Sequence, residues 1–202
     1  MIFSSKRAIL SDKELLSHIS QLKTIMLLVS VLADLDLPVS NLLALDQSST
    51  TTGYAVFKDG KPVVISHFTV SGDLGDRLEK IRNKIIGLIK EHEIDEVVFE
   101  DIQLQDMAGG RDVGIKTFKI LAEVFGVVHE LMTELDMDYT IVPPIVWKAT
   151  FKIAGKGRSV EKKLAQKYVL TTYGIECTED EADATCIGAH IIKKQGSEFN
   201  WA

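Results

Sequence analysis

Two acidic residues follow short apolar runs, in positions that end buried strands. Asp46 comes after the apolar run 42–45, and Glu100 comes after the run 97–99. A carboxylate is costly to bury unless it is paired with a charge or binds a cation. The alternative for Asp46 is a cap on the turn 47–52, although that turn already carries five hydroxyl groups of its own. We therefore predict a cation site at these strand ends.

A pair of aspartates near the C-terminus has helical spacing. Asp180 and Asp183 lie three residues apart at the start of a predicted helix, which Thr178 is placed to cap. At that spacing both carboxylates share one face of the helix, whereas Glu181 points elsewhere. Acids in a first helical turn are also common because they suit the helix macrodipole, which is the alternative interpretation. Three separate acidic sites in one chain favour a shared role.

The four candidate ligands, Asp46, Glu100, Asp180 and Asp183, offer only carboxylate oxygens. No matching cluster of Cys and His accompanies them in the sequence, so their chemistry suits hard cations such as Mg²⁺ or Mn²⁺. Carboxylates that hold two such ions about 4 Å apart stabilise both the attacking and the leaving oxygen of a phosphodiester displacement. The residue types therefore predict metal-dependent phosphodiester hydrolysis with two ions in each active site.

The charge of the chain is unevenly distributed. The formal net charge is −6, which disfavours a nucleic-acid partner because neutralisation of phosphates dominates such binding. Between residues 148 and 167, however, seven basic residues accompany one acid, Glu161, so the local charge is +6. Gly155 and Gly157 free backbone amides there to approach a phosphate, whereas a solvated surface is the alternative. We predict that DNA binds this basic strip, which comprises Lys148, Lys152, Lys156, Arg158, Lys162, Lys163 and Lys167.

The elements that must position these residues follow from hydrophobic periodicity. The pattern predicts an α/β domain that begins with a hairpin over 42–57, in which Gly53 permits the reversal. Further strands are predicted over 63–70, 97–100 and 139–142, the first of them after an Asp59-Gly60 turn. Helical spacing predicts helices over 74–92, 113–135, 159–173 and 179–194, and a short helix around Trp147.

The first 39 residues lie outside this pattern and are predicted to form a helical extension to a domain at 40–202. Ser11 and Glu14 have the spacing of a capping box, and apolar residues recur at helical intervals over 12–33. The apolar run 26–33 is too short to cross a bilayer, so no membrane partner is expected. We favour packing of this helix on the domain or on a partner over an anchor or a targeting peptide.

Length and composition bound the remaining possibilities. A chain of 202 residues with 46% hydrophobic content can build one substantial domain. Cys177 and Cys186 have no metal-type partner, and both are expected to be small core residues. Nothing in the sequence resembles a secretory signal. We therefore expect a reducing compartment such as the cytoplasm.

The acidic motifs and the basic strip, in their order along the chain, resemble those of the RuvC-type Holliday-junction resolvases of the ribonuclease-H-like superfamily. The resemblance spans about residues 40–195 and rests on a DxS hairpin, a strand that ends in Glu100, and a DxxD helix. The hairpin motif is formed by Asp46 and Ser48, and the helix motif by Asp180 and Asp183. Between them, in the order typical of the family, lie a helix rich in small residues, a Val-x-Lys element, a Gly-x-Gly segment and a Glu-Lys pair, at 116–131, 146–148, 155–157 and 161–162.

The resemblance implies a five-stranded mixed sheet flanked by helices and a Mg²⁺- or Mn²⁺-dependent endonuclease that cleaves four-way junctions or other branched DNA. It implies that Lys148 and Lys162 lie near the scissile phosphate. It also implies a two-fold homodimer, since resolving a four-way junction takes two cuts. The implied metal ligands are Asp46, Glu100, Asp180 and Asp183.

Two features depart from the pattern of the family. Gln103 stands where cellular members usually have an aromatic residue, three positions after the second acid. The segment after Gly157 is one residue longer than the common pattern. Both departures favour a phage-encoded relative with relaxed demands on DNA sequence. The resemblance therefore implies that the compartment is the cytoplasm of a bacterium or of a phage-infected host cell.

The predicted helix 113–135 offers an interface for a homodimer. Its apolar residues Phe118, Leu121, Phe125 and Val128 recur at helical intervals, and Gly126 would allow close approach. The alternative is that this apolar stripe packs on the sheet of its own domain.

Two other functions stay open at this point. The hairpin also resembles the phosphate-binding hairpin of the sugar-kinase and actin-like superfamily, but such kinases need a second, related half that this chain has no room for. A binding module with a decayed site would have lost an acid, whereas all four are present. His190, seven residues after Asp183, either faces the same site or is structural.

Overall fold

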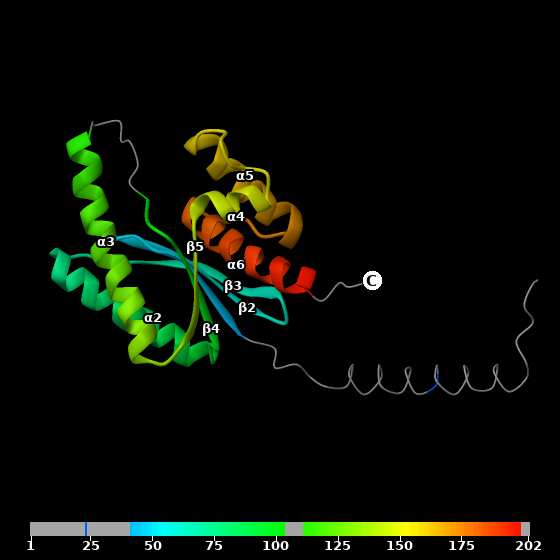
Figure 1. The fold of residues 1–202 in the computed structure, drawn as a ribbon, viewed down its shortest axis with the longest axis horizontal. Helices are drawn as coiled ribbons and strands as arrows, with labels where there is room; N and C mark the ends of the chain where they lie inside the picture. Colours follow the sequence, from blue (N-terminus) through cyan, green and yellow to red (C-terminus); the bar gives the residue numbers. More distant parts are fainter. Residues whose placement is uncertain (1–22, 24–40, 104–110, 199–202) are drawn as a thin grey trace, which may run out of the picture. The chain divides into compact units, whose positions relative to one another are not determined.

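The computed structural model describes residue 23 and the ranges 41–103 and 111–198 (Figure 1). Apart from residue 23, the helix predicted over 12–33 and the boundary predicted after residue 39 lie outside these described residues, so the N-terminal extension stays a prediction. Within the described ranges, no helix has the length and hydrophobicity needed to span a membrane.

A five-stranded sheet forms the centre of the domain. Its order is β3-β2-β1-β4-β5, in which β3, β2 and β1 are antiparallel neighbours and β1, β4 and β5 are parallel neighbours. The mixed sheet predicted from the sequence is confirmed, with small differences at the strand ends. The strands are β1 (Leu42–Asp46), β2 (Thr51–Lys58), β3 (Lys61–Thr69), β4 (Glu96–Glu100) and β5 (Asp138–Val142).

Helices cover both faces of this sheet (Figure 1). One face carries α2 (Leu74–His92) and α3 (Arg111–Glu134), and the other carries α4 (Pro144–Thr150), α5 (Arg158–Tyr173) and α6 (Glu179–Glu198). The central strand β1 is therefore buried on both sides. Leu43 and Leu45 lie in the core formed with α2 and α3, whereas Leu42 and Ala44 lie in the core formed with α6. This two-sided burial explains why the run 42–45 is continuously apolar.

Two different turns close the hairpins. Asp59 and Gly60 both have positive φ, 52° and 69°, as the tight turn between β2 and β3 requires. Between β1 and β2, Ser48 Oγ donates to the Thr51 carbonyl at 2.6 Å and accepts from the Thr51 amide at 3.2 Å. Ser48 rather than Asp46 therefore caps this turn, which removes the alternative role of Asp46.

The apolar stripe of α3 packs on its own domain. Val124 and Val128 are fully buried, and the ring of Phe125 lies 5.6 Å from that of Phe99 on β4. Gly126 is exposed, and a Cβ there would meet nothing within 4 Å. Val128 therefore has no exposed surface to offer a partner, and Phe125 packs on the sheet, as the alternative interpretation of the stripe expects.

Candidate active site

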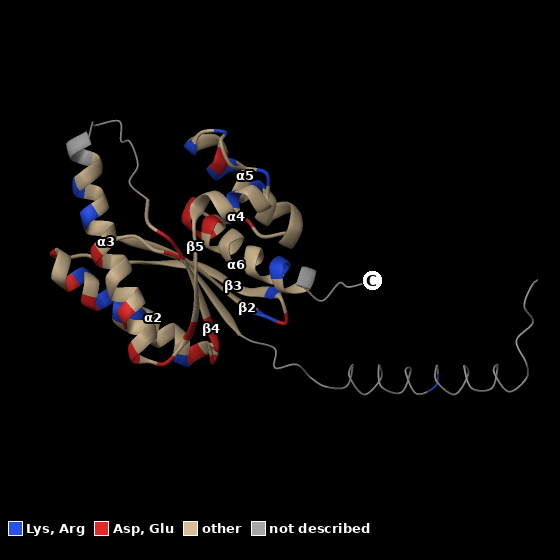
Figure 2. Ribbon diagram, in the orientation of Figure 1, with Lys and Arg blue, Asp and Glu red and all other residues tan. Residues whose placement is uncertain are grey.

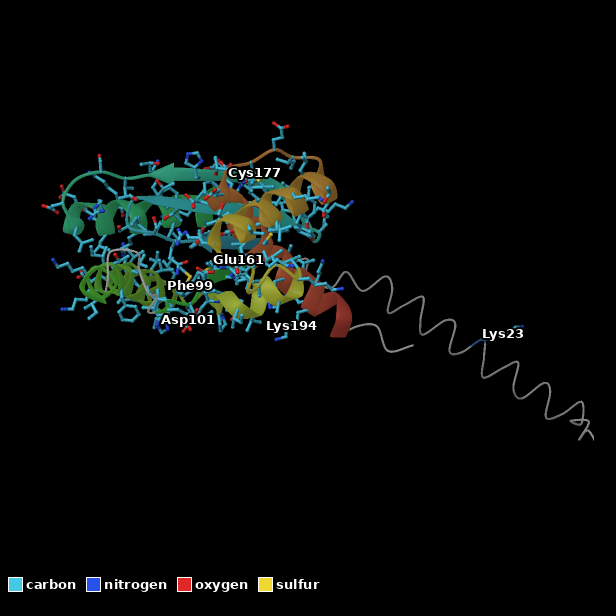
Figure 3. The ribbon with its side chains drawn as sticks, turned by 90° about the horizontal axis from the view of Figure 1, so that it is seen from above. Lys23, Phe99, Asp101, Glu161, Cys177 and Lys194 are labelled. Atoms are coloured by element: carbon cyan, nitrogen blue, oxygen red, sulfur yellow. The ribbon has the colours of Figure 1, made fainter. Side chains whose placement is uncertain are left out.

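Asp46 and Glu100 end neighbouring parallel strands. Because β1 and β4 run in the same direction, both carboxylates lie at the same edge of the sheet. Figure 3 labels Phe99 and Asp101, which flank Glu100 at this end of β4. The apolar residues before each acid are fully buried, so the core fixes the two strand ends.

The first turn of α6 lies close to the strand that carries Asp46 because Gly53, on the neighbouring strand, has no side chain. Gly53 pairs with Asp46 across the hairpin, and a Cβ at position 53 would overlap the backbone of Asp180. The sequence pattern predicts a chain reversal at Gly53, but this residue lies within β2, and its role is close approach of the helix. Further along α6, a Cβ on Gly188 would overlap the ring of Phe57. These two contacts set the first turn of α6 against the strand ends.

Hydrogen bonds fix the first turn of α6. The Glu181 amide donates to Thr178 Oγ1 at 3.4 Å, and the Thr178 amide donates to Glu181 Oε2 at 2.7 Å, which completes a capping box. The other oxygen of Glu181 lies 2.8 Å from Nδ1 of His67 on β3. Glu181 thus points away from Asp180 and Asp183, as the spacing predicts.

All four predicted acids line a single cavity of about 510 Å³. Three basic side chains from the predicted strip line it as well: Lys148, Arg158 and Lys162. The helix α3 contributes an apolar part of the wall through Phe118 and Leu121. The fold therefore brings together acids that are up to 137 positions apart in the chain, from Asp46 to Asp183.

The ammonium group of Lys162 lies among three of the carboxylates. Its Nζ is 2.6 Å from Asp183 Oδ2, 3.5 Å from Asp180 Oδ1 and 3.9 Å from Asp46 Oδ2. Burial by itself would lower the pKa of Lys162, but the three carboxylates outweigh burial and raise the pKa above its usual value. Lys162 is therefore a charged counter-ion inside the acidic site.

The acids carry more negative charge than Lys162 neutralises. Burial raises the pKa of Asp46 well above its usual value, and the charge of Glu100 raises it further. Burial likewise raises the pKa of Glu100 and of Asp183, although Lys162 opposes the rise at Asp183. Bringing another cation into such a site would favour the ionised form of each acid.

The donor set fits a hard cation, but the acids are not arranged as a closed metal cage. In the ranges that the structure describes, no three His, Cys, Asp or Glu side chains form a group that could hold a metal ion. The Lys162 ammonium instead stands between three of the acids. The residues that would hold Mg²⁺ or Mn²⁺ are Asp46, Glu100, Asp180 and Asp183, and we expect Lys162 to move aside when they do.

Lys162→Met is expected to destabilise the metal-free protein at neutral pH by about 3–5 kcal/mol, because it leaves buried carboxylates without their cation. It should also enlarge the rise in Tm that Ca²⁺ produces, since the ion no longer competes with an ammonium group. Thermal unfolding in EDTA and in Ca²⁺ measures both effects. Lys163→Met, at the exposed neighbour on α5, is the matched control. An unchanged Tm of Lys162→Met in EDTA would contradict the role of a buried counter-ion.

The rest of the basic strip is exposed and runs from the end of α4 into α5. Figure 2 shows the basic residues of this region in blue. Glu161, labelled in Figure 3, accepts hydrogen bonds from Lys148 Nζ at 3.0 Å and from the Lys156 amide at 3.2 Å. These bonds outweigh burial and lower the pKa of Glu161. The acid within the strip thus anchors the glycine-containing loop. The strip residues outside the cavity lining are Lys152, Lys156, Lys163 and Lys167.

The sequence pattern did not assign two contacts to Glu100. Trp147 is fully buried, and its indole donates a hydrogen bond to the Glu100 carboxylate. The Gln47 side chain bonds to the Glu100 backbone. The sequence signal for the contact of Trp147 with Glu100 is its position next to Lys148, a predicted site residue. His190 lies elsewhere, with Nδ1 2.8 Å from Thr150 Oγ1 and outside the cavity lining.

Comparison with solved structures identifies the fold. RuvC from Thermus thermophilus, in complex with a Holliday junction substrate, has a TM-score of 0.59 at 12% identity, over 77% of this chain and 95% of that one. The yeast mitochondrial Holliday junction resolvase Ydc2 has a TM-score of 0.55 at 11% identity, over 81% and 82% of the two chains. The fowlpox virus resolvase, in complex with Holliday junction DNA, has a TM-score of 0.52 at 11% identity, over 77% and 98%. No protein-family model and no curated protein sequence matches the chain. The protein therefore has the fold of the RuvC-type Holliday junction resolvases, as its motifs predict.

Proposed function

We propose that the protein is a divalent-metal-dependent endonuclease that cleaves four-way junctions or other branched DNA. One observation carries the proposal: the four acids Asp46, Glu100, Asp180 and Asp183 line one cavity together with three basic side chains. Carboxylates suit hard cations, and the basic groups suit phosphate. The similar structures support a branched substrate, since two of them contain Holliday junction DNA.

Each group in the cavity has a distinct task in this reaction. The four acids would hold two Mg²⁺ or Mn²⁺ ions, which when bound stabilise the attacking and the leaving oxygen of the phosphodiester. Lys148 and Arg158 line the same cavity and would bind phosphate oxygens beside the cut. Lys162 would exchange its carboxylate partners for the same phosphate, which keeps the charge of the site balanced.

The proposal is tested with purified protein and three labelled substrates: a synthetic four-way junction, a flap and a linear duplex, each with and without Mg²⁺. We expect cleavage of the branched substrates in Mg²⁺ and much weaker cleavage of the duplex. Junction binding without cleavage in either Mg²⁺ or Mn²⁺ would indicate a binding module of the same fold instead. Equal cleavage of all three substrates would overturn structure specificity.

Changing three exposed residues of the basic strip, Lys156, Arg158 and Lys163, together to Ala is expected to weaken junction binding. Each phosphate contact adds about one to the slope of log K against log salt, so the triple variant should lower that slope by up to about three. Binding titrations at several salt concentrations measure it. The matched control changes Lys61, Lys84 and Lys90, which are exposed on β3 and α2. Equal slopes of log K against log salt for both triple variants would indicate that the strip is a solvated surface that does not contact DNA.

The proposed assembly is a homodimer, because one active site cuts one strand and resolving a four-way junction requires two cuts. Since Phe125 and Val128 pack inward, the interface needs another surface, and the exposed side of α3 around Gly126 is the candidate. Sedimentation equilibrium at micromolar concentration is the direct test. A strict monomer that cuts junctions in opposed pairs would overturn the dimer.

A further inference from the structure

Glu100 is held at two places, its backbone and one oxygen of its side chain. Trp147 Nε1 donates to Glu100 Oε1 at 2.7 Å. Gln47 Nε2 donates to the Glu100 carbonyl at 2.5 Å, and the Glu100 amide donates to Gln47 Oε1 at 3.2 Å. Among the residues that the structure describes, none is seen to donate a hydrogen bond to the other oxygen, Oε2. One oxygen of the carboxylate is therefore fixed, and the other is available.

Trp147 is a rigid donor. Its side chain is fully buried in the core cluster that includes Val142 and Ile153, on the short helix α4 that follows β5. A buried indole N–H needs a hydrogen-bond partner, and Glu100 is that partner. Because packing fixes the indole ring, the position of Glu100 Oε1 is fixed with it.

Gln47 extends the sheet with its side chain. The parallel pairing of β1 with β4 runs from Leu42 to Leu45 and ends one residue short of Glu100. The amide group of Gln47 then bonds to both backbone groups of Glu100, as a further residue of β1 would do. On the other side, Glu100 pairs with Val142 of β5. The backbone that carries the acid is thus held from both neighbours.

We propose that Trp147 and Gln47 are positioning residues, which orient the Glu100 carboxylate so that Oε2 is presented to a divalent cation. The inference rests on the proposed function, because it requires that Glu100 binds a metal. A glutamate side chain loses rotational freedom when it binds an ion, and prior restraint removes part of that loss. Partners that orient metal ligands in this way contribute about 10- to 100-fold to metal affinity or activity.

The competing explanation is that both residues serve packing alone, since both are buried. Two variants address it: Trp147→Phe keeps an aromatic ring without the N–H donor, and Gln47→Met keeps a side chain of similar length without the amide. Ile153→Val, in the same core cluster as Trp147 but with no role at Glu100, is the control for a small packing defect. Each change is also made in a Glu100→Ala background.

The experiment measures Mn²⁺ binding by titration calorimetry, and kcat and KM for junction cleavage. We expect Trp147→Phe and Gln47→Met to weaken Mn²⁺ binding and to lower kcat by about 10- to 100-fold, with KM unchanged. Ile153→Val should change neither quantity. In the Glu100→Ala background the two positioning variants should have no further effect on the remaining Mn²⁺ binding, because they act through Glu100.

Three outcomes would overturn the inference. Wild-type affinity for Mn²⁺ in both variants would show that neither residue orients Glu100. A loss that persists in the Glu100→Ala background, or that Ile153→Val reproduces, would assign the effect to packing. Absence of both Mn²⁺ binding and cleavage in the wild-type protein would overturn the proposed function itself, and the inference with it. If Trp147→Phe does not fold, Gln47→Met decides between the same outcomes.

Discussion

Asp46→Asn is expected to reduce junction cleavage by more than about 100-fold while junction binding stays intact. Loss of a residue that only supports a metal ligand costs about 10- to 100-fold, and removal of a ligand charge should cost more. Asn has nearly the size of Asp, and Asp46 ends a strand whose preceding residues are fully buried, so the fold should persist. Single-turnover cleavage in Mg²⁺ and gel-shift binding in Ca²⁺ measure the two effects separately.

The same substitution should stabilise the metal-free protein at neutral pH. Burial raises the pKa of Asp46 in the folded state well above the usual value of 3.8, so folding binds a proton between these two values. The free energy of unfolding therefore falls as pH rises through that interval, and Asn removes this loss. The increase in the free energy of unfolding should be absent below about pH 4, where Asp46 of the wild-type protein is protonated in both the folded and the unfolded state. It should amount to about 1.4 kcal/mol for every tenfold difference in proton affinity between the folded and the unfolded state.

A matched control for Asp46→Asn is Asp138→Asn. Asp138 is exposed at the start of β5, so Asp138→Asn makes the same change from Asp to Asn at a position outside the cavity lining. Its cleavage rate and its melting curve against pH should follow those of the wild-type protein. Normal cleavage by Asp46→Asn would remove the basis of the proposed metal site, and a lower Tm at neutral pH would contradict the electrostatic argument.

The sheet and most helices could be predicted because their signals are local. The continuous apolar run of β1 and the helical spacing of α2 both reflect burial, which the sequence records directly. The Asp59-Gly60 turn is likewise specified by two residues that tolerate positive φ. Asp46 and Glu100 could be placed at strand ends for the same reason, since each follows a buried apolar run. That both ends lie at one edge of the sheet follows from the parallel pairing of β1 with β4.

Features that depend on contacts between distant segments could not be predicted in this way. Gly53 indicated a turn locally, whereas its actual constraint is the backbone of Asp180, more than a hundred residues away. The stripe on α3 had two possible burial partners, and periodicity alone does not distinguish a sheet of the same domain from a second subunit. The contact of Lys162 with three aspartates requires α5 and α6 to be adjacent, which no local pattern records.

Cleavage is expected to require Mg²⁺ or Mn²⁺ and to fall to background in excess EDTA. The four acids offer oxygen ligands only, and a bound divalent ion activates water for attack more strongly than any other group among the described residues of the cavity lining. Ca²⁺ should support junction binding without turnover, because its longer and more variable coordination does not hold the reacting oxygens in line. Cleavage and binding assays across the three ions, at constant ionic strength, measure this prediction.

The ion pairs of Lys162 predict how much Mg²⁺ is needed to stabilise the protein against thermal unfolding. Because its ammonium lies 2.6 Å from Asp183, an arriving ion must displace a formed ion pair, and the wild-type protein should need more Mg²⁺ for half-maximal thermal stabilisation than Lys162→Met does. Asp46→Asn removes a ligand and should need more than either. This order of three Mg²⁺ midpoints depends on the ion entering among these carboxylates and not at a remote site. Full cleavage in EDTA, or one shared midpoint for all three proteins, would contradict metal binding at this cavity.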